Sequence, residues 1–254
     1  MLIAITRAVS PAINACELAY VPRQEIDLHK AAEQHGRYEA CLRELGASVL
    51  SLAAEPDLPD SMFVEDPAVV VEETAVMTRM GAESRRGESE SLAAALARFR
   101  PLRRMREPAT LEGGDVMRVG SRLFVGRSAR TNAAGIAQLR SELEVFGYSV
   151  EAVEVRGCLH LKSGCSYLGD GTVLANRSWI DAAALGGLRI IDVPPDEPRA
   201  ANVLAIGGTV VVPEPFPGTA RLLERQGWKV RTLDISELMK AEAGLTCSSI
   251  LLEG

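Results

Sequence analysis

DVMRVGSRLFV, residues 115–125, predicts a β-hairpin, because two short apolar segments flank a turn. A helical stretch at residues 129–146 follows it, and FGYSV at 146–150 adds a glycine stop and a strand. The order of elements is therefore hairpin, helix, strand. A fold assembled from this unit belongs to the α/β class.

The same unit recurs along the chain at intervals of roughly fifty residues. Asp170-Gly171 is a strong tight-turn signal, and Gly46 suits the left-handed end of a helix. The remaining predicted hairpins cover residues 69–77, 167–175 and 203–212, and the remaining predicted helices cover 28–45, 83–99 and 217–227. Four copies are clear, and a degenerate fifth is expected at the start or end of the chain.

One such unit is too small to bury its own apolar face, so the units must pack on one another around a shared centre. We therefore expect a closed α/β ring that forms a single domain over residues 1–254. The chemical residues of such a ring belong on loops and strand ends that face the centre, because sites are usually built on loops held by a rigid scaffold.

The composition excludes several classes of protein. With 47% hydrophobic and 24% charged residues, the chain is neither disordered nor fibrous. Its net charge of -6 repels phosphate backbones and anionic headgroups, and aromatic residues make up only 4% of it. We therefore expect no nucleic-acid partner and no membrane-surface partner.

The location of the protein is predicted from its first residues and its cysteines. Arg7 and Pro11 interrupt the apolar start, and no segment is long and apolar enough to span a bilayer. The five cysteines are irregularly spaced, which favours free thiols in a reducing compartment. These features together predict a cytoplasmic protein.

Four short segments combine acids, glycine, histidine or cysteine next to apolar strands. They are FVEDP at 63–67, LEGGD at 111–115, HLKSG at 160–164 and GLTCSS at 244–249. In the last segment, Gly244 permits an unusual backbone turn just before a thiol. The chain offers only three histidines, so a mechanism that needs imidazole has few candidates.

These four runs, in this order and at compatible separations, resemble the dimethylarginine dimethylaminohydrolases of the guanidine-modifying superfamily. The resemblance covers essentially the whole chain. It implies a five-fold pseudosymmetric α/β propeller and the hydrolysis of Nω-methylated L-arginines, such as asymmetric dimethylarginine and monomethylarginine, to L-citrulline and an alkylamine. It implies no cofactor and no metal.

The resemblance also implies roles for individual residues. Cys247 matches the nucleophile, His160 the general acid and base, and Glu112 the residue that orients His160. The positions that grip the guanidinium nitrogens match Asp66 and Glu65. A lid residue on the loop 14–23 matches Leu18, and the positions that hold the amino-acid end of the substrate match Asp60, Arg85 and Arg130.

The chemistry explains these residue types. A guanidinium carbon is a poor electrophile, so it needs a strong, soft nucleophile and flanking carboxylates. A free thiol is only a few per cent ionised at neutral pH, and the bound guanidinium is a cation that favours the thiolate of Cys247. A pair of arginines would bind an α-carboxylate, which argues against agmatine as substrate.

Several alternatives stay open. Asp115 either joins the site or bonds to its own hairpin backbone, and Arg127 is the fallback for Arg130. Zinc is disfavoured at Cys158 and Cys165, because paired ligand spacings and a second histidine are missing there.

Two other functions compete with the methylarginine hydrolase. An arginine deiminase shares the fold, the nucleophile and the product, whereas a non-catalytic arginine or citrulline sensor would use the pocket alone. Apart from the small-molecule substrate, the expected partner is a second copy of the chain in a possible homodimer.

Overall fold

The computed structural model describes residues 1–254 and contains five three-stranded sheets. In every sheet the middle strand pairs antiparallel with one neighbour and parallel with the other. A hairpin followed by a crossover to a parallel strand gives this pattern, so the α/β class and the hairpin-and-strand part of the predicted unit are confirmed. Between β10 and β11 the crossover carries only a short 3-10 helix, Ala182–Leu185. The chain divides into two compact units, one made of Met1–Val64 with Val193–Gly254 and the other of Glu65–Asp192.

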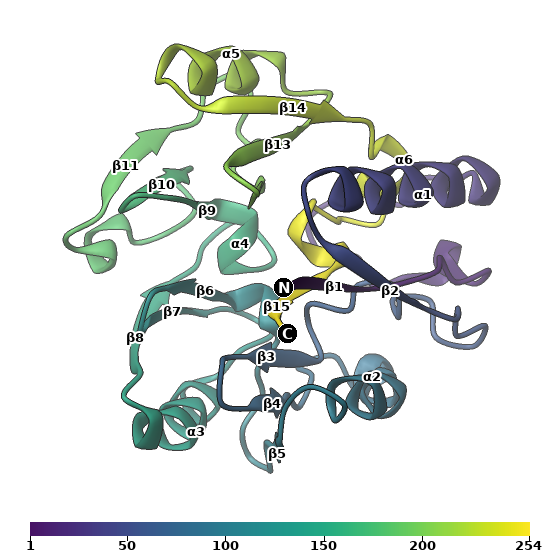
Figure 1. Ribbon diagram of the computed structural model, residues 1–254, viewed down its shortest axis with the longest axis vertical. Coiled ribbons are helices and arrows are strands. Elements are labelled where there is room, and N and C mark those ends of the chain that lie inside the picture. Colours follow the sequence, from purple (N-terminus) through teal and green to yellow (C-terminus); the bar gives the residue numbers. More distant parts are fainter. The chain divides into compact units, whose positions relative to one another are not determined.

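The first unit holds two of the sheets. One has the order β15-β1-β2 and the other β12-β13-β14. Their strands are β1 (Leu2–Arg7), β2 (Ser48–Leu52), β12 (Leu204–Ile206), β13 (Thr209–Pro213), β14 (Lys229–Leu233) and β15 (Ile250–Glu253). The helices are α1 (Leu28–Glu44), α5 (Pro217–Arg225) and α6 (Ser236–Met239). Because β1 pairs with β15, both chain ends supply the fifth copy (Figure 1).

The second unit holds the other three sheets, with the orders β3-β4-β5, β6-β7-β8 and β9-β10-β11. Their strands are β3 (Ala68–Val70), β4 (Ala75–Met77), β5 (Leu102–Arg104), β6 (Val116–Val119), β7 (Arg122–Arg127), β8 (Ser149–Glu154), β9 (Cys165–Gly169), β10 (Thr172–Ala175) and β11 (Arg189–Asp192). The helices are α2 (Ser89–Leu96), α3 (Ala133–Leu143) and α4 (Leu161–Gly164).

Local sequence explains where these elements begin and end. The side chain of Asp27 caps α1 by accepting a hydrogen bond from the Lys30 amide at 3.0 Å. The hairpin turn between β9 and β10 is made by Asp170 and Gly171, both with positive φ, as expected for an Asp-Gly turn. The turn signals in the sequence therefore mark real boundaries.

The continuous helix predicted for residues 83–99 is wrong in its first half. A 3-10 helix covers Glu83–Glu88, and the α-helix proper is α2. With three residues per turn, a 3-10 helix places positions 85 and 88 one above the other. The two residues at those positions, Arg85 and Glu88, are both buried and form an ion pair. The tighter helix therefore turns both inward.

Each unit has its own apolar core. In the first unit, Tyr38 and Leu42 of α1 pack with Ile13, Met62 and Leu245. In the second, one cluster forms around Leu123 and Leu139, and another forms around Phe124 and Val173. Leu123 and Phe124 are consecutive on β7, so this strand is apolar on both faces. The loops that leave β7 therefore start from a rigid base.

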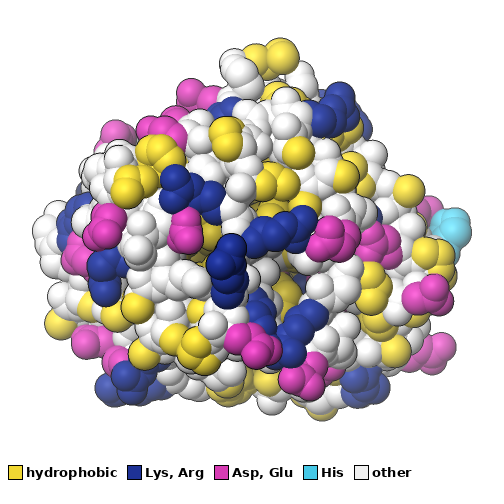
Figure 2. All heavy atoms as spheres, turned by 90° about the horizontal axis from the view of Figure 1, so that it is seen from below, with side chains coloured by type: hydrophobic (Ala, Val, Ile, Leu, Met, Phe, Trp, Pro, Cys, Tyr) yellow, Lys and Arg dark blue, Asp and Glu magenta, His cyan; other side chains and the backbone are white.

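The arginine-rich run at residues 98–106 lies around β5, an edge strand of its sheet. Arg103 pairs with Glu142 at 2.8 Å and Arg104 with Glu90 at 2.9 Å. Figure 2, which looks from the side where β5 lies in Figure 1, shows Lys and Arg side chains interspersed with Asp and Glu. Charges on an edge strand discourage pairing with another chain.

A helix with the length and apolar character to cross a membrane does not occur in the structure.

Candidate active site

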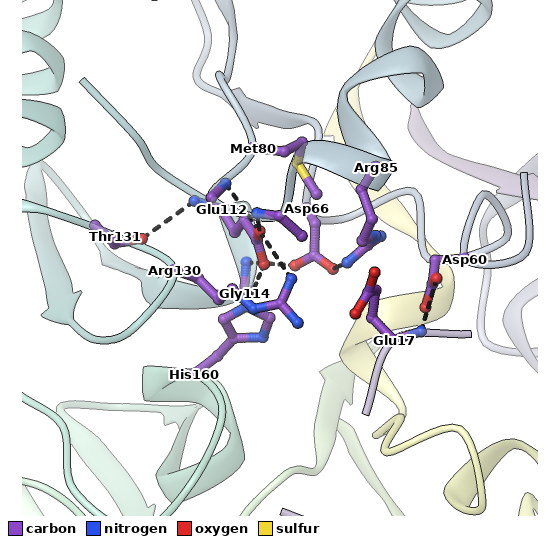
Figure 3. A network of polar contacts seen from close by, with 12 residues as sticks. Glu17, Asp60, Asp66, Met80, Arg85, Glu112, Gly114, Arg130, Thr131 and His160 are labelled. Atoms are coloured by element: carbon purple, nitrogen blue, oxygen red, sulfur yellow. Dashed lines mark hydrogen bonds and ion pairs between the residues drawn. The ribbon is translucent and has the colours of Figure 1, made fainter. Parts of the chain in front are cut away.

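The predicted site residues belong to both units. Leu18, Asp60 and Cys247 lie in the first unit, and the others, which are Glu65, Asp66, Arg85, Glu112, Arg130 and His160, lie in the second. Figure 3 shows five members of the second group close together, which are Asp66, Arg85, Glu112, Arg130 and His160.

His160 and Glu112 form the centre of this group. His160 immediately precedes α4, and Glu112 immediately precedes the 3-10 helix that leads into β6. The Nε2 atom of His160 lies 2.7 Å from Oε2 of Glu112. His160 is 5% exposed and Glu112 is fully buried. A hydrogen bond sheltered in this way fixes the plane of the imidazole ring.

The second oxygen of Glu112 has a cradle of its own. It accepts hydrogen bonds from the amides of Gly81 and Ala82 at 3.0 and 3.2 Å, and Nη1 of Arg130 lies 3.4 Å from it. Burial favours the neutral acid, but the hydrogen bond and charge of His160, with Arg85 and Arg130, lower the pKa of Glu112 to about 2. Glu112 is therefore ionised at neutral pH.

The same arrangement determines the charge of His160. Burial alone would lower the pKa of the ring, but the charge of Asp66, the hydrogen bond to Glu112 and the charge of Asp115 raise it to about 9. At neutral pH His160 is therefore an imidazolium ion. Because Nε2 is used by Glu112, Nδ1 is the nitrogen left to exchange a proton with a substrate.

Asp66 is held between a backbone amide and an arginine. Its Oδ1 accepts from the amide of Gly114 at 3.0 Å, and its Oδ2 accepts from Nη1 of Arg85 at 2.8 Å. Arg85 in turn donates Nε and Nη2 to the two oxygens of Glu88, both at 2.9 Å. The planar fork of Arg85 is thus bound to two buried carboxylates, and it fixes the direction of Asp66.

Two close approaches require glycine in this group. A Cβ atom at Gly114 would come within 2.6 Å of Nδ1 of His160 and 2.8 Å of Oδ1 of Asp66. A Cβ atom at Gly81 would come within 2.4 Å of the carbonyl oxygen of Arg130. These glycines let the backbone reach the charged side chains.

Glu65 contacts a residue of α4. Its carboxylate accepts a hydrogen bond from the ammonium group of Lys162, two residues after His160. Both side chains are largely buried, at 11% and 15% exposed. Lys162 thus ties the FVED run to the HLKS run.

The thiol of Cys247 lies on a short 3-10 helix, Thr246–Ser248, directly before β15. The side chain is half-buried, and its Sγ accepts a hydrogen bond from the Gly244 amide at 3.4 Å. Asn202 clamps the neighbouring Thr246, because its amide oxygen accepts from the Thr246 nitrogen and its amide nitrogen donates to the hydroxyl, both at 3.1 Å. An amide donor beside sulfur favours the thiolate.

Leu18 lies on a loop that is tied down on both sides. The amide of Glu17 donates to Oδ2 of the buried Asp60 at 3.0 Å, and the amides of Ala19 and Tyr20 donate to the carboxylate of Glu242 at 2.8 and 3.1 Å. Within the first unit, Asp60 therefore binds the backbone of the residue before Leu18.

Two of the open alternatives gain structural detail. Arg127 is exposed and pairs with Glu154, whereas Arg130 is 12% exposed and lies beside Glu112. Asp115 is fully buried, and its carboxylate accepts hydrogen bonds from Ser128, Thr131 and the Leu161 amide. Its bonds therefore reach well beyond its own hairpin.

Sequence reasoning did not single out several supporting residues. Glu88 bonds to Arg85, and Thr131 bonds to the backbone of Glu112. Lys162 bonds to Glu65, and Asn202 bonds to Thr246. Lys162 falls inside the quoted HLKSG run, but the other three lie outside every motif. Apart from Glu88, which is close to Arg85 in sequence, their partners are distant in sequence, so no local spacing signals them.

Asp66, Glu112 and His160 are also of the residue types that bind metal ions, and their ligand atoms lie within 4.8 Å of one another. In the structure these atoms already have partners. Nε2 of His160 and Oε2 of Glu112 bond to each other, and both oxygens of Asp66 accept hydrogen bonds. A metal would have to displace these bonds.

Comparisons with known proteins agree with this geometry. Residues 54–185 match the family model of arginine deiminase. The chain is 38% identical over 226 residues to the N(G),N(G)-dimethylarginine dimethylaminohydrolase of Pseudomonas aeruginosa, covering 88% of this chain and 89% of that protein. It is 39% identical over 251 residues to the enzyme of the same name from Streptomyces coelicolor, covering 98% and 96%.

A solved structure extends the similarity to three dimensions. A cysteine-to-serine variant of the Pseudomonas aeruginosa enzyme, complexed with citrulline, superposes with a TM-score of 0.93 at 34% identity, and 98% of each chain is covered. The fold and the matched family model define the class as the arginine deiminase family. Within that class, the chain belongs to the dimethylarginine dimethylaminohydrolase family.

Proposed function

We propose that this chain hydrolyses Nω-methylated L-arginines, asymmetric dimethylarginine and monomethylarginine among them, to L-citrulline and an alkylamine. One observation carries the proposal beyond family membership. The buried ion pair of His160 and Glu112 holds a proton on the imidazole at neutral pH. Departure of an amine from a guanidinium carbon requires such an acid, because an amide anion is too poor a leaving group.

Cys247 is the proposed nucleophile. Its thiolate attacks the guanidinium carbon, the C–N bond to the methylated nitrogen breaks, and His160 gives its proton to the departing amine. The product of this half-reaction is a covalent thiouronium adduct on Cys247. In the second half-reaction His160 takes a proton from water, the resulting hydroxide adds to the same carbon, the C–S bond breaks, and the added hydroxyl group loses its proton to solvent as neutral citrulline leaves. The thiolate and the imidazolium are thereby restored.

The carboxylates of Asp66 and Glu65 are proposed to bind the guanidinium nitrogens and to localise its charge. Both are already directed by cations before the substrate arrives, Asp66 by Arg85 and Glu65 by Lys162.

We assign Leu18 to a lid and Asp60, Arg85 and Arg130 to the amino-acid end of the substrate. Of the two arginines, Arg130 is the better candidate to bind the α-carboxylate of the substrate. Its one hydrogen bond, to Glu112, is long at 3.4 Å, whereas Arg85 makes three shorter ones, to Asp66 and Glu88.

The five sheets are proposed to close into a five-fold pseudosymmetric propeller, so that residues 1–254 form a single catalytic domain. The repeated strand order of the sheets supports this arrangement. We further propose a cytoplasmic enzyme that needs no cofactor or metal and binds no nucleic acid or membrane. It would work alone or as a homodimer. The net charge of -6 and the five thiols, none in a disulfide, support these proposals.

The decisive experiment compares four substrates: asymmetric dimethyl-L-arginine, monomethyl-L-arginine, L-arginine and agmatine. We expect citrulline and an alkylamine from the first two and no turnover of agmatine, which lacks the α-carboxylate. Cys247→Ser should abolish turnover, whereas Cys41→Ala, which removes a buried thiol from α1, should retain it. Preferred turnover of L-arginine would instead assign a deiminase. Binding of all four without turnover would assign a sensor.

A further inference from the structure

Asp115 is a buried carboxylate that the proposed mechanism does not use. It is fully buried at the start of β6. Its Oδ1 accepts from the amide of Leu161 at 2.8 Å, and its Oδ2 accepts from the hydroxyls of Ser128 and Thr131 at 2.6 and 2.7 Å. Three donors on one buried carboxylate satisfy its charge without a cation.

The direction of each of these hydrogen bonds is fixed by the neighbouring backbone. The hydroxyl oxygen of Ser128 accepts from the amides of Arg130 and Thr131 at 3.0 and 3.2 Å. The hydroxyl oxygen of Thr131 accepts from the amide of Glu112 at 3.2 Å. The Ser128 hydroxyl already accepts from two amides, so it must donate its one proton to Asp115, and the Thr131 hydroxyl donates to Asp115 as well. Burial raises the pKa of Asp115, and these hydrogen bonds oppose that rise by favouring the ionised carboxylate.

Each of the three bonds leads to a different residue of the candidate active site. The Leu161 amide fixes the backbone directly after His160. Thr131, which donates to Asp115, accepts a hydrogen bond from the Glu112 amide, and Figure 3 shows this second bond as a dashed line. Ser128, which also donates to Asp115, accepts a hydrogen bond from the Arg130 amide.

We propose that Asp115 is the positioning residue of the catalytic acid: it sets the mutual geometry of His160, Glu112 and Arg130 through Leu161, Thr131 and Ser128. This inference rests on the proposed function, because that function makes His160 the catalytic acid. It does not require Asp115 to touch the substrate. Gly126 on β7 provides the space, since a Cβ atom there would come within 2.5 Å of Oδ1 of Asp115.

The charge of Asp115 has a second effect on His160. The ring faces three carboxylates, those of Asp66, Glu112 and Asp115, and Arg85 and Arg130 lie against the first two. Removing one negative charge destabilises the imidazolium. A purely structural role in the fold would leave the titration of His160 unchanged.

The first test is Asp115→Asn in the full chain. In either orientation the NH2 group of asparagine meets donors, either the two hydroxyls or the Leu161 amide, so at least one of the three hydrogen bonds of Asp115 is lost. With asymmetric dimethylarginine as substrate, we expect kcat to fall about 10²-fold, the loss typical of a misplacement of about 1 Å. NMR titration of the histidine Cε1 protons should show a lower pKa for His160, with His29 and His35 as internal references.

A second set of variants tests the network without changing its charge. Thr131→Val keeps the shape and loses the hydroxyl, whereas Thr131→Ser restores the hydroxyl. We expect kcat to fall at least about tenfold in the first and to recover in the second. Thr209→Val is the matched control, because this buried hydroxyl on β13 has no hydrogen-bond partner. It should leave kcat unchanged.

Two results would overturn the proposal. One is a folded Asp115→Asn variant with the kcat and the His160 titration of the wild type. If that variant does not fold, the other is a Thr131→Val variant whose kcat equals that of Thr209→Val. A wild-type protein that turns over no methylated arginine would refute the proposed function instead. The NMR titration would still decide whether Asp115 acts on His160.

Discussion

The charge of His160 can be tested through the stability of the protein, independently of any substrate. The pKa of the ring is about 9 in the folded chain and about 6.5 in an unperturbed imidazole. Because the folded-state pKa is the higher one, the protonated ring stabilises the fold. This stabilisation is fully present below pH 6.5 and is lost as the pH rises through about 9. At about 1.4 kcal/mol for each pH unit, its size is ~3 kcal/mol.

The perturbation is His160→Gln, because a glutamine amide reaches the position of Nε2 and can still donate to Glu112. We would measure the free energy of unfolding in urea, by circular dichroism, at intervals from pH 6 to pH 10. The wild type should lose ~3 kcal/mol more than the variant between pH 6.5 and pH 9.5. Subtracting the variant removes the contribution of every other group that titrates in this range.

Parallel profiles for the two proteins would refute the reasoning. They would mean that His160 is neutral in the folded chain, so that it enters the reaction as a base and not as an acid. The carboxylate of Glu112 gives a second check at acid pH. Its pKa is lowered to about 2, so the stabilisation it contributes is present above pH 4.5 and is lost as the pH falls through about 2.

Two further substitutions test the glycine contacts and the loop of Leu18. Gly114→Ala should lower kcat about 10²-fold, because its Cβ atom would displace Nδ1 of His160. The control is Gly36→Ala, at an open position of α1. Equal kcat values for the two variants would contradict the prediction. Glu242→Ala removes the acceptor of the Ala19 and Tyr20 amides, so chymotrypsin should cleave the exposed site after Tyr20 roughly tenfold faster than in Glu242→Gln. Equal cleavage rates would show that the loop is held elsewhere.

The repeating unit was predictable from the sequence because its signals are local. A glycine stop or an Asp-Gly turn is set by the conformations that a few neighbouring residues can adopt. The fifth copy was less certain, since its strands β1 and β15 come from opposite ends of the chain. The 3-10 helix at Glu83–Glu88 was not predictable, because it depends on an ion pair of Arg85 that is buried only in the folded unit.

The candidate site divides in the same way. The residues proposed for the reaction itself and for binding the guanidinium lie in four short motifs, so the sequence points to them directly. Leu18, Asp60, Arg85 and Arg130 lie outside these motifs and were assigned from the family resemblance alone. The residues that hold them are ordinary polar residues. Thr131, for example, lies 19 positions from its partner Glu112, and Glu88 lies 3 positions from its partner Arg85. Their importance comes from burial and from the exact count of donors and acceptors, and neither exists before the chain folds.

The balance of charge in the second unit explains why the site suits a cation. Three carboxylates face the acid, those of Asp66, Glu112 and Asp115, and a fourth, Glu88, pairs with Arg85. The cations among them are Arg85, Arg130 and protonated His160. One negative charge is left over, since Glu65 and Lys162 neutralise each other. A guanidinium ion would balance the charge when it binds. Citrulline is neutral and would leave the site unbalanced again, so the same arrangement favours binding of the substrate and release of the product.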